Sequence, residues 1–274
     1  MAVLLSIANI VLPVLYGALL ILYGRYFVST SRRVQPWLTP ALLATVLLHL
    51  LTLILIGVNG GHYPLSHVSE VLTFLALSIT VIYLYIETAI KVKTTGLFVL
   101  SVVFCIQVAS SFIIDFQRVA PEILDSRLFI FHTTSVIIAY TALFISGLYS
   151  LMYLLLFYRI KHARFGLIYG RLPSLEVLNA MNGRAATLGF IFLTLAIFLG
   201  LMWRRAEFPA EPHFDPKVIS AYLTWVVYAV HIFGNTIGHW AGKRLAYISL
   251  AGVAVILFSM LVVNFAFPTF HRFG

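Results

Sequence analysis

Eight apolar runs, each of about 20 residues or more, are the feature of this sequence that most constrains its fold. They cover residues 3–27, 38–58, 71–90, 95–114, 127–158, 185–203, 218–238 and 245–267. About 20 apolar residues in a helix cross the hydrocarbon core of a bilayer, and a spanning helix satisfies its own backbone hydrogen bonds. The sequence therefore predicts an all-α, polytopic integral membrane protein with about eight transmembrane helices.

The composition and the links between the runs favour one transmembrane domain over residues 1–274. Hydrophobic residues make up 61% of the chain and charged residues 10%, whereas soluble domains are roughly half apolar and a quarter charged. No low-complexity tract or clear internal repeat interrupts the pattern. The single cysteine, Cys105, excludes a Cys-x-x-Cys-His attachment motif and a disulfide framework within the chain.

The basic residues indicate the orientation of the chain. They lie in short links rather than on one basic face with aromatic residues between, so the formal net charge of +9 is not a nucleic-acid signature. The first basic residue, Arg25, follows the first apolar run, which favours a retained helix over a secretory signal. Placing both termini outside puts 12 of the 18 Lys and Arg residues on the cytoplasmic side, as the positive-inside rule requires.

Two links carry local signals. The inner link at 159–183 contains Pro173-Ser174-Leu175-Glu176, which has the serine cap and early acidic residue of a helix start and predicts a short surface helix. The outer loop at 60–70 has no Lys or Arg and is expected to be ordered over the outer face. Its histidines, His62 and His67, are interpreted as solvated.

Four other histidines are candidate ligands because of their depth. His49 and His231 fall inside predicted spans and are expected to face each other near mid-membrane. His132, just inside the fifth span, and His271, just beyond the eighth, are expected to pair at the outer face. Ionisable residues within spans are costly and are functional by default, and two neutral imidazoles can hold haem iron as axial ligands. The alternative is that each histidine hydrogen-bonds a neighbouring helix.

The polar loop and helix start at 204–217 form a second candidate feature. Phe208, Phe214 and Trp225 are placed to stack on a porphyrin, and Asp215 opens the helix that carries Trp225. Three basic side chains are placed to pair with haem propionates: Arg204, Arg205 and Lys217. The alternative is an ordinary interfacial belt of aromatic and basic anchors.

Several strings of this sequence are shared with one family. They are the run Leu172-Pro173-Ser174-Leu175-Glu176-Val177-Leu178, the outer-loop residues Pro64-Leu65-Ser66 with Glu70, Phe131-His132, Val263-Asn264 followed by His271, and Asp215-Pro216-Lys217. From about Leu47 to its carboxyl end the chain resembles the CcsA (ResC) family of cytochrome c assembly proteins, the haem-handling membrane component of the System II pathway.

The chain departs from the family pattern in the tryptophan-rich haem loop. Only Phe208 and Phe214 stand where that loop has tryptophans, and Val218 replaces a glutamate. The family histidine also falls about two residues beyond His231. In these features the chain is similar to the CcsA-like relatives typified by HemX and YpjD.

The resemblance implies a multi-pass protein of the bacterial inner membrane that binds haem b non-covalently and presents it at the periplasmic face between His132 and His271. The implied partners are apocytochrome c and a CcsB (ResB) protein. The resemblance also implies that the chain is part of a holocytochrome c synthase, but the altered loop leaves open whether it catalyses attachment. The alternatives are a non-catalytic haem-binding assembly or regulatory subunit and a haem-free small-molecule transporter.

Overall fold

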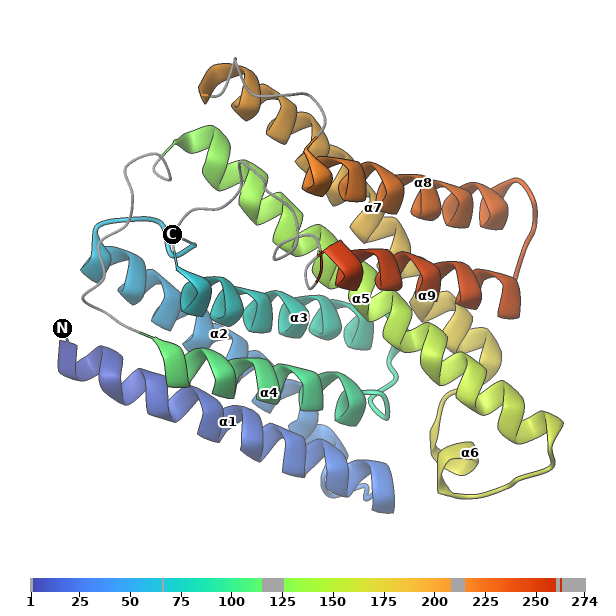
Figure 1. The fold of residues 1–274 in the computed structure, drawn as a ribbon. Coiled ribbons are helices and arrows are strands. Elements are labelled where there is room, and N and C mark those ends of the chain that lie inside the picture. The colour runs from blue at the N-terminus through green and yellow to red at the C-terminus, as the bar shows by residue number, and fades with distance from the viewer. Residues whose placement is uncertain (1, 66, 115–125, 208–214, 260–261, 263–274) are drawn as a thin grey trace. The chain divides into compact units, whose positions relative to one another are not determined.

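The structure is a computed structural model that describes residues 2–65, 67–114, 126–207, 215–259 and 262 (Figure 1). These residues form nine α-helices and no strand. The helices are α1 Ala2–Ser29, α2 Gln35–Gly60, α3 Val68–Ile90, α4 Gly96–Ile113, α5 Arg127–Lys161, α6 Leu167–Arg171, α7 Leu175–Glu207, α8 Pro216–Thr236 and α9 Lys243–Phe258.

The helix lengths confirm an all-α polytopic membrane protein. Seven of the described helices are long and apolar enough to cross a membrane, namely α1 to α5, α7 and α8. The eighth predicted span corresponds to α9, which is described over 16 residues; most of its remaining length lies outside the described residues. The placement of both termini outside stays a prediction.

The contacts divide the chain into two compact units. Unit 1 comprises Met1–Asp125 and Arg164–Pro173, and unit 2 comprises Ser126–Ala163 and Ser174–Gly274. Within each unit four helices pack as a ring in chain order: α1, α2, α3 and α4 in unit 1, and α5, α7, α8 and the shorter α9 in unit 2. The expectation of one domain over residues 1–274 stays a prediction.

Unit 1 has an apolar core at one end and a tether at the other. The core cluster contains Leu5 of α1, Leu53 of α2 and Leu77 of α3. The tether is the guanidinium of Arg171 at the end of α6, which donates to the hydroxyl of Thr30 and to a carbonyl of α1, both at 2.7 Å. The segment that precedes α7 therefore packs back on α1.

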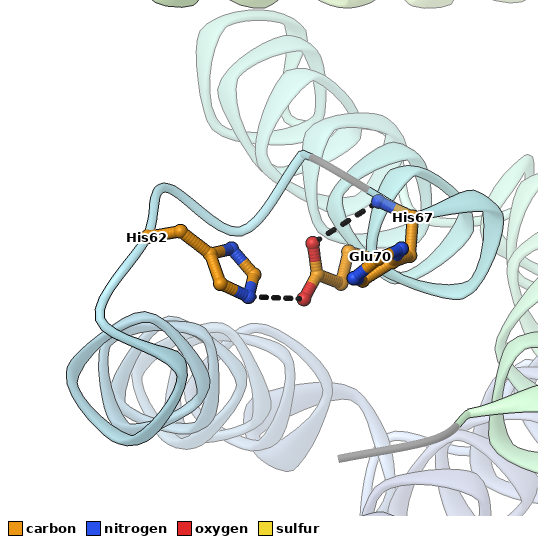
Figure 2. Close-up of side chains that lie close together, drawn as sticks. All are labelled: His62, His67 and Glu70. Atoms are coloured by element: carbon orange, nitrogen blue, oxygen red, sulfur yellow. Dashed lines mark hydrogen bonds and ion pairs between the residues drawn. The ribbon is translucent and has the colours of Figure 1, made fainter. Parts of the chain in front are cut away.

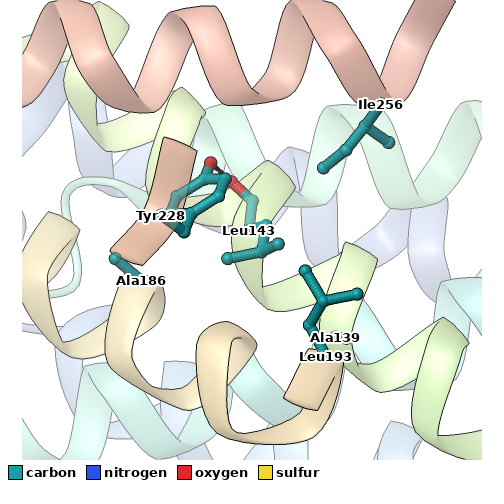
Figure 3. Close-up of a cluster of buried hydrophobic side chains, with 6 residues drawn as sticks. All are labelled: Ala139, Leu143, Ala186, Leu193, Tyr228 and Ile256. Atoms are coloured by element: carbon teal, nitrogen blue, oxygen red, sulfur yellow. Dashed lines mark hydrogen bonds between the residues drawn. The ribbon is translucent and has the colours of Figure 1, made fainter. Parts of the chain in front are cut away.

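Unit 2 is held together by close packing of small residues. Its core cluster brings Leu143 of α5, Ala186 of α7 and Tyr228 of α8 together (Figure 3). A Cβ added at Gly189 of α7 would lie 2.4 Å from the Leu143 side chain, and one at Gly252 of α9 would lie 2.4 Å from the Tyr228 ring. Small residues at such positions let membrane helices approach closely, which supplies the packing that hydrophobic burial cannot supply in lipid.

The helix start at Ser174 is confirmed, but the short surface helix is not. The Val177 N–H donates to the Ser174 hydroxyl at 3.4 Å, and the helix that begins there is α7, which continues through the sixth span to Glu207. The separate short helix of the link is α6, upstream of Pro173. The start signal identifies where a helix begins, whereas its length depends on the apolar residues that follow.

Candidate functional site

His132 lies on the first two turns of α5 and faces α7. Its Nδ1 is 2.9 Å from the carbonyl oxygen of Ala196, and its ring stacks on Trp203 with 6.3 Å between the ring centroids and 15° between the planes. A Cβ at Gly200 would lie 2.7 Å from the His132 ring. The ring therefore fits against α7 because position 200 has no side chain.

The hydrogen bond at Nδ1 fixes the chemistry of the His132 ring. A carbonyl oxygen only accepts, so the Nδ1–H of His132 donates to Ala196. In the neutral imidazole the lone pair then lies on Nε2. Histidines that bind metals commonly donate the other ring N–H to a carbonyl or carboxylate in this way. The half-buried His132 ring is thus held in one orientation, with the tautomer that metal-binding histidines commonly have, and its ligation of iron stays a prediction.

His231 is fully buried on the last third of α8 and is bonded through the same ring nitrogen. Its Nδ1 is 3.0 Å from the hydroxyl oxygen of Ser249 on α9. The Ser249 hydroxyl donates to the Asn182 carbonyl oxygen at 3.0 Å, as does the Ser146 hydroxyl at 2.6 Å. Ser249 has a single proton, so His231 Nδ1–H is the donor between the two and the lone pair lies on Nε2.

The Nε2 atom of His231 is buried and has no hydrogen-bond partner among the described residues. A buried polar atom without a partner costs free energy, and an unpaired atom of this kind in a native fold calls for an explanation such as an unseen ligand. Ligation of a metal through Nε2 would satisfy it.

His49 is equally buried in α2 of unit 1, but both of its nitrogens are bonded. The Thr73 hydroxyl donates to the Gln107 side-chain oxygen at 2.9 Å, so at 2.9 Å it accepts from His49 Nε2. The Nδ1 atom then accepts from the Tyr16 hydroxyl at 2.8 Å. Iron ligation by His49 would require the exchange of one of these hydrogen bonds, and this assignment stays a prediction.

The remaining predicted site residues are only partly described. Asp215 is buried and caps α8, with its carboxylate accepting from the Lys217 N–H at 2.8 Å. Trp225 is half-buried, donates its indole N–H to the Thr194 hydroxyl at 2.9 Å, and lies against the Phe190 ring. The other three, Phe208, Phe214 and His271, lie outside the described residues.

The structure separates the two predicted ligands of unit 2, His132 and His231, from each other. His132 contacts α7 at Ala196, whereas the Ser249 partner of His231 contacts α7 at Asn182. These contacts are 14 positions apart on α7, or about 21 Å along the helix axis. His132 and His231 therefore cannot be the two axial ligands of one iron. His49 belongs to unit 1, so the expectation that it faces His231 stays a prediction.

The comparisons with known proteins identify the family. The sequence profile described as "Cytochrome C assembly protein" matches residues 65–271, which is well over half of the chain. The chain belongs to the cytochrome c assembly protein family. The match includes every predicted site residue except His49, which precedes it.

Curated relatives agree with this family. The chain is 31% identical over 235 residues to the cytochrome c biogenesis protein CcsA of Chlamydomonas reinhardtii, with 83% of this chain and 65% of the relative covered. It is 28% identical over 245 residues to the CcsA of Prochlorococcus marinus, with 79% and 77% covered. The CcsA of Chlorella vulgaris is 26% identical over 256 residues, with 82% and 81% covered.

Sequence reasoning missed the residues that hold the histidines in place. Ala196 and Gly200 are four positions apart on α7 and form the surface against which the His132 ring fits. Their i, i+4 spacing of small residues in an apolar run is typical of a close helix contact and was a usable signal. Ser249 and Asn182 carry no such signal, because isolated polar residues in spans do not indicate their partners.

Proposed function

We propose that this chain is a haem-binding membrane protein of cytochrome c assembly in the System II manner, which handles haem and presents it at the periplasmic face. The family membership supports the role in cytochrome c biogenesis. The haem-binding part is supported by one observation: His132 and His231 both donate Nδ1–H to the protein and keep the lone pair on Nε2.

The donor set fits haem rather than a small hard cation. Imidazole nitrogens are common ligands of haem iron, so histidine Nε2 atoms would hold and protect the iron of a bound haem. His132, held by Ala196 and by the Trp203 ring, would orient one ligand bond at the end of unit 2 where α5 begins. His231 would supply a separate, more buried position. In this proposal His271 completes the outer pair with His132, and Phe208, Phe214 and Trp225 line the porphyrin.

The proposal extends to location and partners. The chain would lie in a bacterial inner membrane with its amino and carboxyl ends in the periplasm, and it would act on apocytochrome c beside a ResB-type protein. The 12 to 6 distribution of Lys and Arg supports this orientation. Labelling of single cysteines placed at Ser29 and at Gly61 should report opposite sides of the membrane, and the same side for both would contradict the topology.

The decisive test of haem binding is the absorption spectrum of the purified protein and of His132→Ala. The wild type should contain non-covalent b-type haem, and His132→Ala should lower its content or shift its reduced spectrum. Added imidazole should partly restore the spectrum by filling the vacant position. His162→Ala is the matched control, because that histidine is exposed. Protein without haem, or a His132→Ala spectrum identical to the control, would overturn the proposal.

A second candidate function, haem binding without catalysis of attachment, is favoured by the loop between α7 and α8. Attachment needs the porphyrin edge held close to two cysteine thiols, and a misplacement of about 1 Å can cost on the order of a hundredfold in rate. Phe208 and Phe214 offer smaller faces than tryptophan and no indole N–H.

We expect poor attachment of haem to a Cys-x-x-Cys-His substrate by this chain, alone or with a ResB-type partner. The measurement is covalent haem staining of a reporter cytochrome in a host that lacks its own assembly system. Staining equal to that of an authentic System II synthase would contradict this expectation and would show that the chain takes part in haem attachment.

A further inference from the structure

Three potential metal ligands meet at the end of unit 1 where α2 ends and α3 begins (Figure 2). They are His62 in the loop, His67 directly before α3, and Glu70 in its first turn. One ligand atom from each residue lies within 4.8 Å of those from the other two. His62 Nε2 is 3.7 Å from Glu70 Oε1, and the side chains of both residues are only 7% exposed. The two solvated histidines expected from the sequence are therefore gathered around a sheltered carboxylate.

Hydrogen bonds orient two of these donors toward a common point. His62 Nδ1 is 3.0 Å from its neighbour's carbonyl, that of Tyr63, so Nδ1–H donates and the lone pair of the neutral ring lies on Nε2, which faces Glu70. Glu70 Oε2 accepts from the His67 backbone N–H at 3.3 Å, which leaves Oε1 directed at His62. A metal-binding histidine whose other nitrogen is held by a carbonyl is the usual arrangement.

The backbone of the loop is shaped to return His62 over the end of α2. Gly61 adopts a left-handed conformation with φ of 66°, which glycine enters without strain. A Cβ at Gly60 would lie 2.6 Å from His62 Nε2, so the ring rests against a glycine. The loop at 60–70 contains no Lys or Arg, and no cationic side chain of the loop itself therefore opposes a bound cation.

We propose that His62, His67 and Glu70 form a binding site for one divalent transition-metal ion of the Zn²⁺ type. Two imidazoles and a carboxylate suit zinc, iron, nickel or copper, whereas magnesium and calcium prefer oxygen ligands. Zinc holds such ligands at about 2.0–2.1 Å in a tetrahedron, which places the donor atoms about 3.3 Å apart. The observed donors need to close by no more than about 1.5 Å, which requires rotation of the His62 side chain in the loop and exchange of the capping-box hydrogen bond between the His67 side chain and the Glu70 backbone.

The bound ion would join the loop to the first turn of α3 and retain an open position. Three protein ligands leave the fourth zinc position for water or for an exogenous donor. This site lies wholly within unit 1, and it requires neither haem nor any residue of the haem proposal.

The test is a competitive titration of detergent-purified, chelator-stripped full-length protein with Zn²⁺ against a chromophoric chelator. We expect one Zn²⁺ per chain that excess Mg²⁺ does not displace. His62→Ala, His67→Ala and Glu70→Gln should each weaken binding at least about tenfold, while the exposed His162→Ala should not. Glutamine keeps an oxygen that can accept from the His67 N–H, so Glu70→Gln isolates the loss of the carboxylate.

Two further measurements keep the result interpretable. Gly60→Ala retains all three donors but displaces the His62 ring, so weakened Zn²⁺ binding in this variant supports the site even where a donor variant fails to fold. Haem content should be the same in the loop variants and the wild type, which separates this site from the haem proposal. Absence of stoichiometric Zn²⁺ binding, or equal affinity in the loop variants and His162→Ala, would overturn the inference.

Discussion

His49 in unit 1 and His231 in unit 2 are buried to the same extent, with none of either residue exposed, yet their surroundings differ. His49 is enclosed by a network in which both ring nitrogens have protein partners, Tyr16 and Thr73. His231 is bonded through Nδ1 to Ser249, and its Nε2 has no partner among the described residues. In His49 both ring nitrogens are therefore hydrogen-bonded to the protein and no ligand is needed to satisfy them. In His231 one ring nitrogen is left for a ligand to satisfy.

This difference teaches that burial within a membrane does not by itself identify a ligand. A charged or polar group is costly there whether it serves the fold or a cofactor, and a satisfied network removes the cost in either case. The occupancy of each ring nitrogen distinguishes the two roles. By this criterion the hydrogen bonds of His49 serve the packing of unit 1, whereas ligation through the Nε2 atom of His231 stays a prediction.

The largest expected effect is on stability, from His49→Ala. The substitution leaves the Thr73 oxygen without the donor at His49 Nε2, leaves Thr80 as the remaining partner of the Tyr16 hydroxyl, and opens a cavity among α1, α2 and α3. We expect the free energy of unfolding to fall by about 2–4 kcal/mol, measured by denaturation in detergent micelles with His162→Ala as the control. A fall of less than about 0.5 kcal/mol would show that His49 does not stabilise unit 1 and would contradict the comparison with His231.

The second expected effect is on haem, from His231→Ala. This substitution also opens a cavity, but it removes one hydrogen bond where His49→Ala removes two, so the free energy of unfolding should fall by about 1 kcal/mol less than in His49→Ala. Haem content should fall, and imidazole should restore part of it. His231→Ala with wild-type haem content but a stability loss as large as that of His49→Ala would reverse the assignment of roles.

The smallest expected effect sharpens the account of the His49 network. Thr73→Val keeps the shape of the side chain but removes the hydroxyl that links His49 Nε2 to Gln107. We expect a loss of about 1 kcal/mol in unfolding free energy and no change in haem content. Thr73→Ser retains the hydroxyl and should keep most of the stability, so equal losses in the two variants would point to packing rather than hydrogen bonding.

The helices of this protein were largely predictable from the sequence, because a span requires a long apolar run and leaves a strong local signal. The fifth run begins at residue 127, and α5 begins at Arg127. The sixth run, from 185, underestimates α7, which begins at Leu175. The first turns of α7 include Glu176 and Asn179, and polar helical turns of this kind lie outside any apolar run.

The place of His132 near the start of the fifth helix also followed from the sequence. Its orientation did not, because that depends on Ala196 and Gly200 of another helix. The interpretation of His62 and His67 as solvated omitted the turn at Gly61, which returns the loop to Glu70. Phe208, Phe214 and His271 lie outside the described residues, so their roles stay predictions.

The sequence by itself determined that this chain is an all-α membrane protein, because the length of each apolar run and the distribution of charge are local properties that decide insertion into a bilayer. Only the tertiary structure decided which ring nitrogens of His49, His132 and His231 are held by the protein. It also decided that α1 to α4 pack in one unit and that α5, α7, α8 and α9 pack in another. The physical reason is that a hydrogen bond joins atoms more than 60 positions apart, as between His132 and Ala196, and such a pairing exists only after the helices have packed.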